Sequence, residues 1–333
     1  MAAVPRLSIG LPVYNGQDYL AESLDALLGQ SYADFELIIS DNASTDGTAE
    51  ICRQYQQQDT RIRYLRQPRN IGAAPNHTFV FGQSRGELFK WAAADDLYAR
   101  DLIESCVEAL DEHPDVVLAH SWTAAVDSQG TVTQALEYPL ATDSRHTPDR
   151  FRSMLYGNGE DDFGLIRADD QYGVIRSEVL RRVPPQDSYY HSDRTLMTEI
   201  ALHGPFHQTP RWLYFRRDHA DRPQYAYPTV RGWCANLDPR RRDRLRHPAV
   251  RLYTEYVWGY AAAIRRSPLS AADKRECYRC LAEWTTGRIQ VVAGRALRGH
   301  KAAAGQTSAV LAAAAPPVIS VDGVVAGRES RPS

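Results

Sequence analysis

Short apolar runs alternate with longer helical patterns through the first 125 residues of the chain. The short runs predict β-strands at residues 7–11, 35–39, 62–65, 87–91 and 116–119, since compact apolar runs bounded by polar turns are typical of buried strands. Apolar residues at helical spacing between them predict helices at 20–28, 48–57, 73–83 and 100–112. This alternation predicts an α/β fold, in which a mostly parallel sheet carries helices on both faces.

The second half of the chain has a weaker pattern. Residues 127–185 contain clusters of Asp, Gly and Pro, and a helical pattern returns only at 193–204, before an apolar run at 212–215. Further helices are predicted at 253–265 and 271–298, and the Ala-rich end of the chain predicts a disordered tail. We therefore expect one α/β domain over residues 1–220, a helical C-terminal extension over 221–300 and a tail over 301–333.

Composition and charge narrow the functional classes. The 333 residues are 43% hydrophobic and 24% charged, with a net charge of −2, which excludes a disordered or fibrous chain. A nearly neutral chain has no overall field to attract nucleic acid, so no nucleic-acid partner is expected. The start of the chain lacks a signal-peptide pattern, no run is long enough for a transmembrane helix, and the five cysteines are scattered. These features predict a cytoplasmic protein with reduced thiols.

One segment departs from this neutral balance. Residues 211–251 hold 11 Arg against 4 Asp. The segment has two interpretations. It is either a solvated surface that pairs with acidic residues of the first half, or a surface that binds an anionic acceptor or makes a peripheral contact with an acidic membrane. The predicted helices after this segment are also a candidate surface for pairing two subunits.

Two adjacent carboxylates, Asp95 and Asp96, follow the predicted strand at 87–91. The ligand crevice of a parallel sheet lies at the carboxyl ends of its strands, and neighbouring carboxylates repel each other unless a cation neutralises them. Oxygen ligands suit Mg²⁺ or Mn²⁺, which usually also bind phosphate oxygens of a substrate. The alternative is that one Asp caps the next helix and the other is solvated.

Five short motifs occur in order before residue 97. They are P-x-Y-N at 12–15, Q-S-Y-x-D-F-E-L at 30–37, D-N-x-S-x-D-x-T at 41–48, N-x-G at 70–72 and a D-x-D position at 94–96. Together they resemble the motifs of family 2 glycosyltransferases, over about residues 6–220. The resemblance implies the GT-A fold, a Rossmann-like sheet whose nucleotide-sugar half ends near residue 125 and whose acceptor half covers 126–220.

The resemblance implies a donor-nucleotide site at the first two strand ends. Pro12, Tyr14 and Asp41 would line the nucleotide base, and Asn76 would approach it from the helix at 73–83. The residue types agree with this, because a Tyr ring can stack on a base and an Asp can accept a hydrogen bond from a ring N–H. Each also has a structural alternative, since Asp41 can cap the helix that follows it.

The resemblance also implies a metal site. Asp95 would contact the ribose or the metal, and Asp96 would ligate Mg²⁺ or Mn²⁺ directly. The first D-x-D position is Ala94, so the motif is shortened and a weaker metal affinity is expected. His219, shortly after the apolar run at 212–215, resembles a position that completes the metal or diphosphate site in many GT-A enzymes.

Cations and a base complete the implied site. Arg216 and Arg217 can neutralise a leaving diphosphate. Asp193 opens a helix that ends at Gly204, eleven residues later, which is the family's spacing for the catalytic base, although the Glu that usually precedes it is Ser192. The alternative for Asp193 is a helix N-cap.

The function implied is inverting transfer of a sugar from a nucleotide-diphosphate sugar to an acceptor hydroxyl of a glycan, a lipid-linked intermediate or a small molecule. A nucleotidyltransferase fits poorly, because no Gly-rich loop with Arg and Lys for a triphosphate follows the first strand. An NAD-dependent oxidoreductase fits poorly too, because no G-x-G-x-x-G motif follows that strand. A non-catalytic sugar-nucleotide binder or assembly subunit is the alternative from a different class. Ala94 and Ser192 favour it, and the intact Asp95, Asp96 and Asp193 favour an enzyme.

Overall fold

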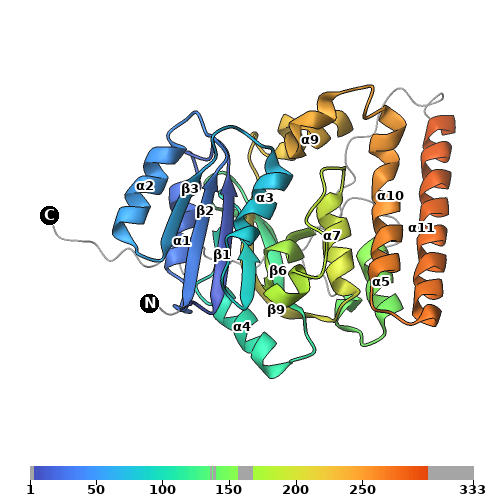
Figure 1. The fold of residues 1–333 in the computed structure, drawn as a ribbon, viewed down its shortest axis with the longest axis horizontal. Coiled ribbons are helices and arrows are strands. Elements are labelled where there is room, and N and C mark those ends of the chain that lie inside the picture. The colour runs from blue at the N-terminus through green and yellow to red at the C-terminus, as the bar shows by residue number, and fades with distance from the viewer. Residues whose placement is uncertain (1–3, 136, 138–139, 157–167, 299–333) are drawn as a thin grey trace.

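The computed structural model describes residues 4–135, 137, 140–156 and 168–298 (Figure 1). The tail expected at 301–333 lies outside these residues. A nine-stranded sheet forms the centre of the described chain, in the order β3-β2-β1-β4-β8-β6-β9-β5, with β7 paired to β6. The strands are β1 (Leu7–Val13), β2 (Phe35–Asp41), β3 (Ile62–Arg66), β4 (Leu88–Trp91), β5 (Leu97–Tyr98), β6 (Leu118–Val126), β7 (Val132–Ala135), β8 (Val174–Arg176) and β9 (Phe206–Arg217).

Helices connect these strands and cover both faces of the sheet (Figure 1). The longer ones are α1 (Leu20–Leu28), α2 (Thr48–Gln58), α3 (Ala73–Gly82), α4 (Leu102–Glu112), α5 (Thr147–Tyr156), α7 (Ser192–Ala201), α9 (Val230–Leu237), α10 (Ala249–Arg266) and α11 (Ala271–Arg298). The shorter ones are η1 (Ala141–Asp143), η2 (Ala168–Tyr172), α6 (Ser177–Leu180), α8 (Pro223–Ala226) and η3 (Pro239–Arg242). None of the helices in the described ranges is long and apolar enough to cross a membrane.

Strand direction confirms the predicted α/β class. The pairs β1–β2, β2–β3, β1–β4 and β6–β9 are parallel. Strand β8 runs antiparallel to both β4 and β6, and so joins the two parallel groups. Strands β5 and β7 are antiparallel to β9 and β6 at the far side. The carboxyl ends of β1, β2 and β4 therefore meet at one edge of the sheet.

The core has one apolar layer on each face of the sheet and a third layer beneath the C-terminal helices. Leu24 of α1, Cys52 of α2 and Val107 of α4 pack on one face. Side chains of α3, α5, α6 and α7 pack on the other. The third layer joins α5 to α10 and α11, and includes Tyr260 and Trp284. The C-terminal helices α10 and α11 thus pack outside α5 and α7, on the side of the sheet that α7 covers (Figure 1).

Several element bounds differ from those expected. Helix α4 begins at Leu102, two residues after the predicted start, and β6 extends to Val126. Strand β9 covers Phe206–Arg217, far longer than the apolar run at 212–215. Its early residues are half-buried or exposed, and its pairing with β6 shifts register beside Trp212, so apolarity alone could not reveal its length. As a result Arg216 and Arg217 lie within the sheet.

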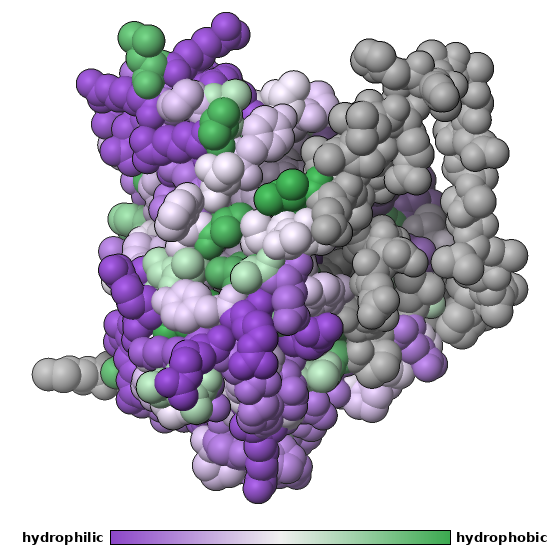
Figure 2. Space-filling model, turned by 90° about the vertical axis from the view of Figure 1, so that its right-hand side faces the viewer, coloured by the Kyte–Doolittle hydropathy of each residue, from purple (hydrophilic) through white to green (hydrophobic). Residues whose placement is uncertain are grey.

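Residues 127–185 are also more regular than expected, since β7, α5, η2, β8 and α6 lie within them. The face of the molecule formed by the C-terminal helices is mainly hydrophilic, with a band of less hydrophilic and apolar residues across its middle (Figure 2).

Candidate functional site

Asp96 lies between β4 and β5, at the edge where the parallel strands end. Strand β5 pairs with β9, with Tyr98 opposite Tyr214, and this pairing brings the end of β9 beside Asp96. The carboxylate is completely buried and accepts hydrogen bonds from the Tyr214 hydroxyl and, at 2.8 Å, from the backbone N–H of Arg217. Burial raises the pKa of Asp96 above its usual range, and the negative charge of Asp95 raises it further.

Asp95 is the partly exposed member of the pair. One of its carboxylate oxygens lies 2.9 Å from Nε2 of His219, whose side chain is 10% exposed. Burial alone would raise the pKa of Asp95, but the hydrogen bond with His219 and the positive charge of Arg222 lower it below its usual value. Asp95 is therefore held ionised beside Asp96. The structure thus brings together three residues that the sequence singled out, Asp95, Asp96 and His219.

Arg217 lies beneath this pair and fixes its position. Its guanidinium is buried and donates to the backbone carbonyl oxygen of Asp95 at 2.9 Å, to that of Ser128 at 2.8 Å and to the Glu22 carboxylate at 2.6 Å. It also lies over the ring of Tyr19. These contacts use all three nitrogens, so Arg217 has a packing and positioning role in this structure, and its role toward a diphosphate stays a prediction.

A further cation near the carboxylate pair is one that the sequence analysis did not single out. Arg222 follows β9, and the charges of Asp96 and Asp95 raise its pKa although burial would lower it. Sequence reasoning missed Arg222, because only the turn that returns it toward β9 brings it to the site. Arg216 points instead to Asp169, with the two charged groups 3.5 Å apart.

The loops that follow β1 and β2 form a hydrogen-bonded loop pair. Asn15, which has a φ of 51°, donates its backbone N–H to the Ser44 hydroxyl at 2.9 Å, and its side-chain oxygen accepts from the Thr45 backbone at 2.9 Å. Tyr14, beside it, is 44% exposed. The loop pair therefore holds Tyr14 at the surface next to the half-buried Pro12.

Asp41 and Asn76 lie deeper than Tyr14. The Asp41 carboxylate is buried and accepts from the Ser44 backbone at 2.7 Å and from the Tyr64 hydroxyl at 2.8 Å. The Asn76 amide is also buried, and both its ends bond to Ser40, at 2.6 and 2.9 Å. Asn76 therefore fastens α3 to β2 rather than presenting its amide to a nucleotide.

Asp193 lies in the first turn of α7. The N-cap of this helix is His191, with a φ of 63°, and no side chain caps it by a hydrogen bond. Asp193 is therefore not the N-cap residue, although its carboxylate interacts with the backbone N–H of Arg194 in the first turn. Burial raises the pKa of Asp193, while the nearby Arg194 opposes the rise and Asp169 adds to it.

A second carboxylate pair, Asp169 and Asp170, lies on η2 between the first pair and α7. Burial raises the pKa of Asp170 to about 7, and the charges of Asp169 and Asp193 add to the rise. Asp169 Oδ2 and Asp170 Oδ1 are buried without a hydrogen-bond partner among the described residues. Sequence reasoning missed both residues, because they lie in the segment whose pattern was least regular. The repeated Asp-Asp step was the available signal.

Asp170 should destabilise the fold as the pH rises. Its pKa of about 7 in the folded protein lies above the ordinary value of ~3.9. Asp170 therefore costs the fold nothing below pH ~4, and it lowers the free energy of unfolding as the pH rises from there through 7. Asp170→Asn cannot ionise, and we expect the variant to gain up to about 4 kcal/mol over the wild type at pH 8 and little at pH 4. Urea unfolding at both pH values measures this. An equal difference at the two pH values would contradict the assignment.

The donor set around Asp95 and Asp96 fits a divalent cation bound together with a substrate. Two carboxylates and an imidazole suit Mg²⁺ or Mn²⁺, and Nδ1 of His219 is buried without a hydrogen-bond partner in the described part of the chain. No group of three or more His, Cys, Asp or Glu arranged to hold a metal occurs among the described residues. Asp95, Asp96 and His219 therefore do not form a ready three-ligand site in this structure, and an ion held by the carboxylates would also need ligands from substrate oxygens, as Mg²⁺ usually does.

Several arginines of the basic segment are paired. Arg241 pairs with Asp187 and Glu255, Arg251 also pairs with Glu255, and Arg231 donates to two backbone carbonyl oxygens. The two interpretations of this segment stay predictions.

Comparison with known proteins identifies the family. Residues 8–177 match the family described as Glycosyl transferase family 2. Glycosyltransferase GlyG of Streptococcus pneumoniae serotype 4 is 33% identical over 115 residues, which are 34% of this chain and 38% of that protein. An uncharacterized glycosyltransferase of Haemophilus influenzae is 30% identical over 156 residues, 46% of this chain and 59% of that protein. The matched part thus spans less than two thirds of either relative.

Solved structures share the fold. Residues 1–349 of S. aureus TarS, in complex with UDP-GlcNAc, superpose with a TM-score of 0.60 at 18% identity, covering 88% of this chain and 76% of that one. The same part of TarS in another crystal structure gives a TM-score of 0.57 and covers 90% of this chain and 75% of that one. The likeness therefore extends over the C-terminal helices as well as the sheet.

Proposed function

Since the chain belongs to glycosyl transferase family 2, we propose that it is an inverting glycosyltransferase that moves a sugar from a nucleotide-diphosphate sugar to an acceptor hydroxyl. One observation carries the proposal. The η2 segment lies between two sets of carboxylates. Tyr172 at its end stacks on Tyr214, the ring centroids being 5.2 Å apart, and Tyr214 donates to Asp96. The same segment packs against α7, which carries Asp193. A donor site and a candidate base thus border one short segment.

The donor nucleotide is proposed to bind at the ends of β1 and β2. The exposed ring of Tyr14 offers a stacking surface for a base, and Pro12 borders it. Asp41 would accept a hydrogen bond from a ring N–H of the base, in exchange for its bond from Tyr64. A UDP-GlcNAc complex of the TarS structure supports a nucleotide-sugar donor for this fold.

Asp95, Asp96 and His219 are proposed to hold Mg²⁺ or Mn²⁺, and the bound ion would supply positive charge that stabilises the departing diphosphate. Arg222, whose charge interacts with both carboxylates and whose guanidinium donates to the Arg217 carbonyl oxygen, adds a fixed positive charge nearby. Arg217 keeps the Asp95 backbone in place through its 2.9 Å hydrogen bond.

Asp193 is proposed as the catalytic base. Its ionised carboxylate takes the proton of the acceptor hydroxyl while that oxygen forms a bond to the anomeric carbon. The bond between this carbon and the phosphate oxygen breaks, and its electron pair leaves with the nucleotide diphosphate. Because attack and departure occur on opposite faces, the anomeric configuration inverts. The raised pKa of Asp193 suits a base that must hold this proton.

The test is a turnover assay with UDP-, GDP- and dTDP-sugars in the presence of Mn²⁺. We expect slow nucleotide release to water from donors of one nucleotide class, and faster release once a glycan acceptor is added. Proton NMR of the transferred sugar should show the anomeric configuration opposite to that of the donor. A product that retains the configuration, or no release from any donor by folded protein, would contradict the proposal, the latter in favour of a non-catalytic binder.

A further inference from the structure

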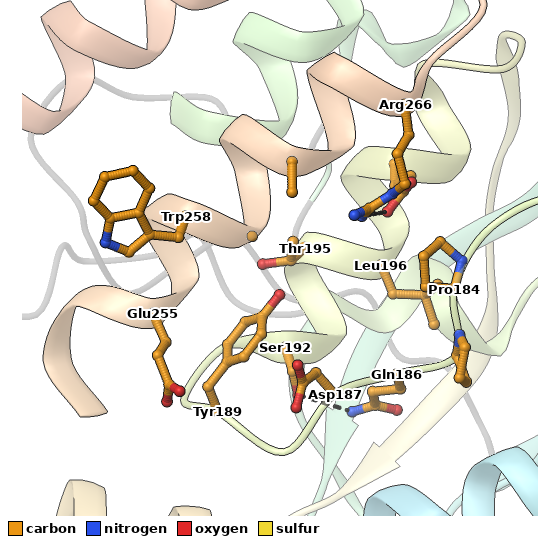
Figure 3. Close-up of a pocket in the computed structure, with 14 residues that line it drawn as sticks. Pro184, Gln186, Asp187, Tyr189, Ser192, Thr195, Leu196, Glu255, Trp258 and Arg266 are labelled. Carbon is orange, nitrogen blue, oxygen red and sulfur yellow. Dashed lines mark hydrogen bonds and ion pairs between the residues drawn. The ribbon is translucent and has the colours of Figure 1, made fainter. Parts of the chain in front are cut away.

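A cavity of about 310 Å³ lies behind α7, on the side away from the sheet. Helix α7, helix α10 and the loop at residues 184–189 enclose it. Trp258 and Glu255 of α10 lie on one side and Pro184 and Gln186 on the other, with Tyr189 and Thr195 between them (Figure 3). Its size falls at the lower end of the range of ligand pockets, roughly 300–1,000 Å³, and it has room for a single small ring.

Close packing of α10 against the loop shapes the floor of this cavity. Residue 259 is Gly, and a Cβ there would lie 2.2 Å from the Tyr189 hydroxyl oxygen. The hydroxyl also interacts with Thr195. A side chain at position 259 would therefore push α10 away from Tyr189 and alter the cavity.

The charges that line the cavity are already paired. Arg266 donates to both carboxylate oxygens of Glu199, at 2.9 and 2.8 Å. Glu255 accepts from Arg241 and Arg251, at 2.6 and 2.7 Å. Since Arg266 is the only cation among the described lining residues and is engaged by Glu199, the cavity offers little to a phosphate or other anion.

The remaining features suit a neutral polyhydroxylated ring. Trp258 is 72% exposed at the rim, so its indole face is open for stacking. Asp187 is 56% exposed; its Oδ1 accepts from Arg241 at 3.1 Å, and its second carboxylate oxygen can accept hydrogen bonds from hydroxyls. The Gln186 amide donates to the Ser192 hydroxyl and accepts from Gln171, each at 3.4 Å, and keeps one further N–H and one further lone pair for a ligand.

We propose that this cavity binds a neutral pyranose unit of a glycan, stacked on Trp258 and hydrogen-bonded to Asp187 and Gln186. Only the origin of the glycan, as acceptor or product, rests on the proposed transferase function. Ser192 and Thr195 line the cavity, and Asp193 lies between them in the first turn of α7. A sugar bound here therefore contacts the helix that carries the proposed base.

Saturation-transfer NMR on the full chain, without nucleotide, tests the binding. The probes are methyl glycosides of glucose, galactose, mannose and N-acetylglucosamine, and their disaccharides. We expect saturation transfer to at least one neutral sugar and about tenfold weaker binding by Trp258→Ala. Tyr253→Ala is the matched control, because Tyr253 is 59% exposed on the same helix and does not line the cavity. That variant should bind as the wild type does.

A second variant fills the cavity instead of opening its rim. Ala262→Leu adds bulk to a lining position and should abolish the same saturation transfer while the protein stays folded. The proposal is overturned if no neutral sugar binds, if Trp258→Ala and Tyr253→Ala bind equally, or if inorganic phosphate displaces the sugar. Equal binding by the Ala262→Leu variant and the wild type also overturns it.

Nucleotide titration separates this proposal from the proposed function. UDP, GDP and dTDP should bind the Trp258→Ala variant as they bind the wild type, because Trp258 lies on α10 and not at the strand ends. If sugars bind the cavity but no donor turns over, the transferase function fails and the cavity proposal stands. If donors turn over but no sugar binds, the cavity proposal fails alone.

Discussion

Asp193→Asn is expected to lower kcat by about 10²–10⁴-fold while nucleotide affinity stays within about twofold of the wild type. The substitution keeps the shape of the side chain but removes its ability to take the acceptor proton. Nucleotide affinity is spared because the proposed base contacts lie at the ends of β1 and β2, whereas Asp193 lies in α7. Steady-state assays with the donor identified by the turnover experiment measure kcat, and calorimetry measures nucleotide binding.

The pH profile gives an independent check on Asp193. Burial raises its pKa, so the carboxylate is protonated and inactive up to a higher pH than an ordinary Asp with its pKa of ~3.9. The acid limb of kcat should therefore lie above that value and disappear in Asp193→Asn. Glu178→Gln removes an exposed carboxylate paired with Arg182 and serves as the control. Undiminished kcat in Asp193→Asn would remove it from the role of base.

Asp96→Asn is expected to abolish the gain in nucleotide affinity that Mn²⁺ provides. The amide oxygen can still accept from the Arg217 backbone N–H, and the Tyr214 hydroxyl can rotate to accept from the new amide group. The fold is therefore kept, while a charged ligand of the proposed metal is lost. We expect at least about 10-fold weaker metal-dependent binding, in line with the loss of charge-assisted contacts.

The matched control for Asp96 is Asp101→Asn. Asp101 lies five residues further on, next to the start of α4, and pairs with Arg211 at the surface. Its loss should leave metal-dependent binding unchanged. A similar loss in both variants would indicate a general effect of charge and not a metal site.

The α/β class and the strand ends could be predicted because their signals are local. The runs at 7–11 and 35–39 became β1 and β2, and the residues directly after them fall at the sheet edge where parallel strands place ligands. Asp95, Asp96 and His219 come together because β5 pairs with β9. The apolar residues of the two strands indicated each strand, but not this pairing.

The remaining features depend on contacts between distant parts of the chain. The sequence names Arg217 only as a cation for a diphosphate, whereas in the structure its guanidinium is buried and pairs with Glu22, 195 positions earlier. Asn76 follows the N-x-G motif at 70–72, which suggested a place near the nucleotide, but both ends of its amide are hydrogen-bonded to Ser40. Asp169 and Asp170 lie in an irregular segment, and only their nearness to Asp193 on α7 gives them significance. Such contacts leave no periodic signal along the chain.

Calorimetric titration of UDP, GDP and dTDP, each with and without Mn²⁺, tests the central claim most directly. The measurement is made on the wild type and on Asp96→Asn. We predict that one nucleotide binds the wild type with an affinity that Mn²⁺ increases, and that the increase is absent in the variant. Binding that is equal with and without Mn²⁺, or no binding of any nucleotide by folded wild-type protein, would contradict a metal-dependent donor site at Asp95 and Asp96.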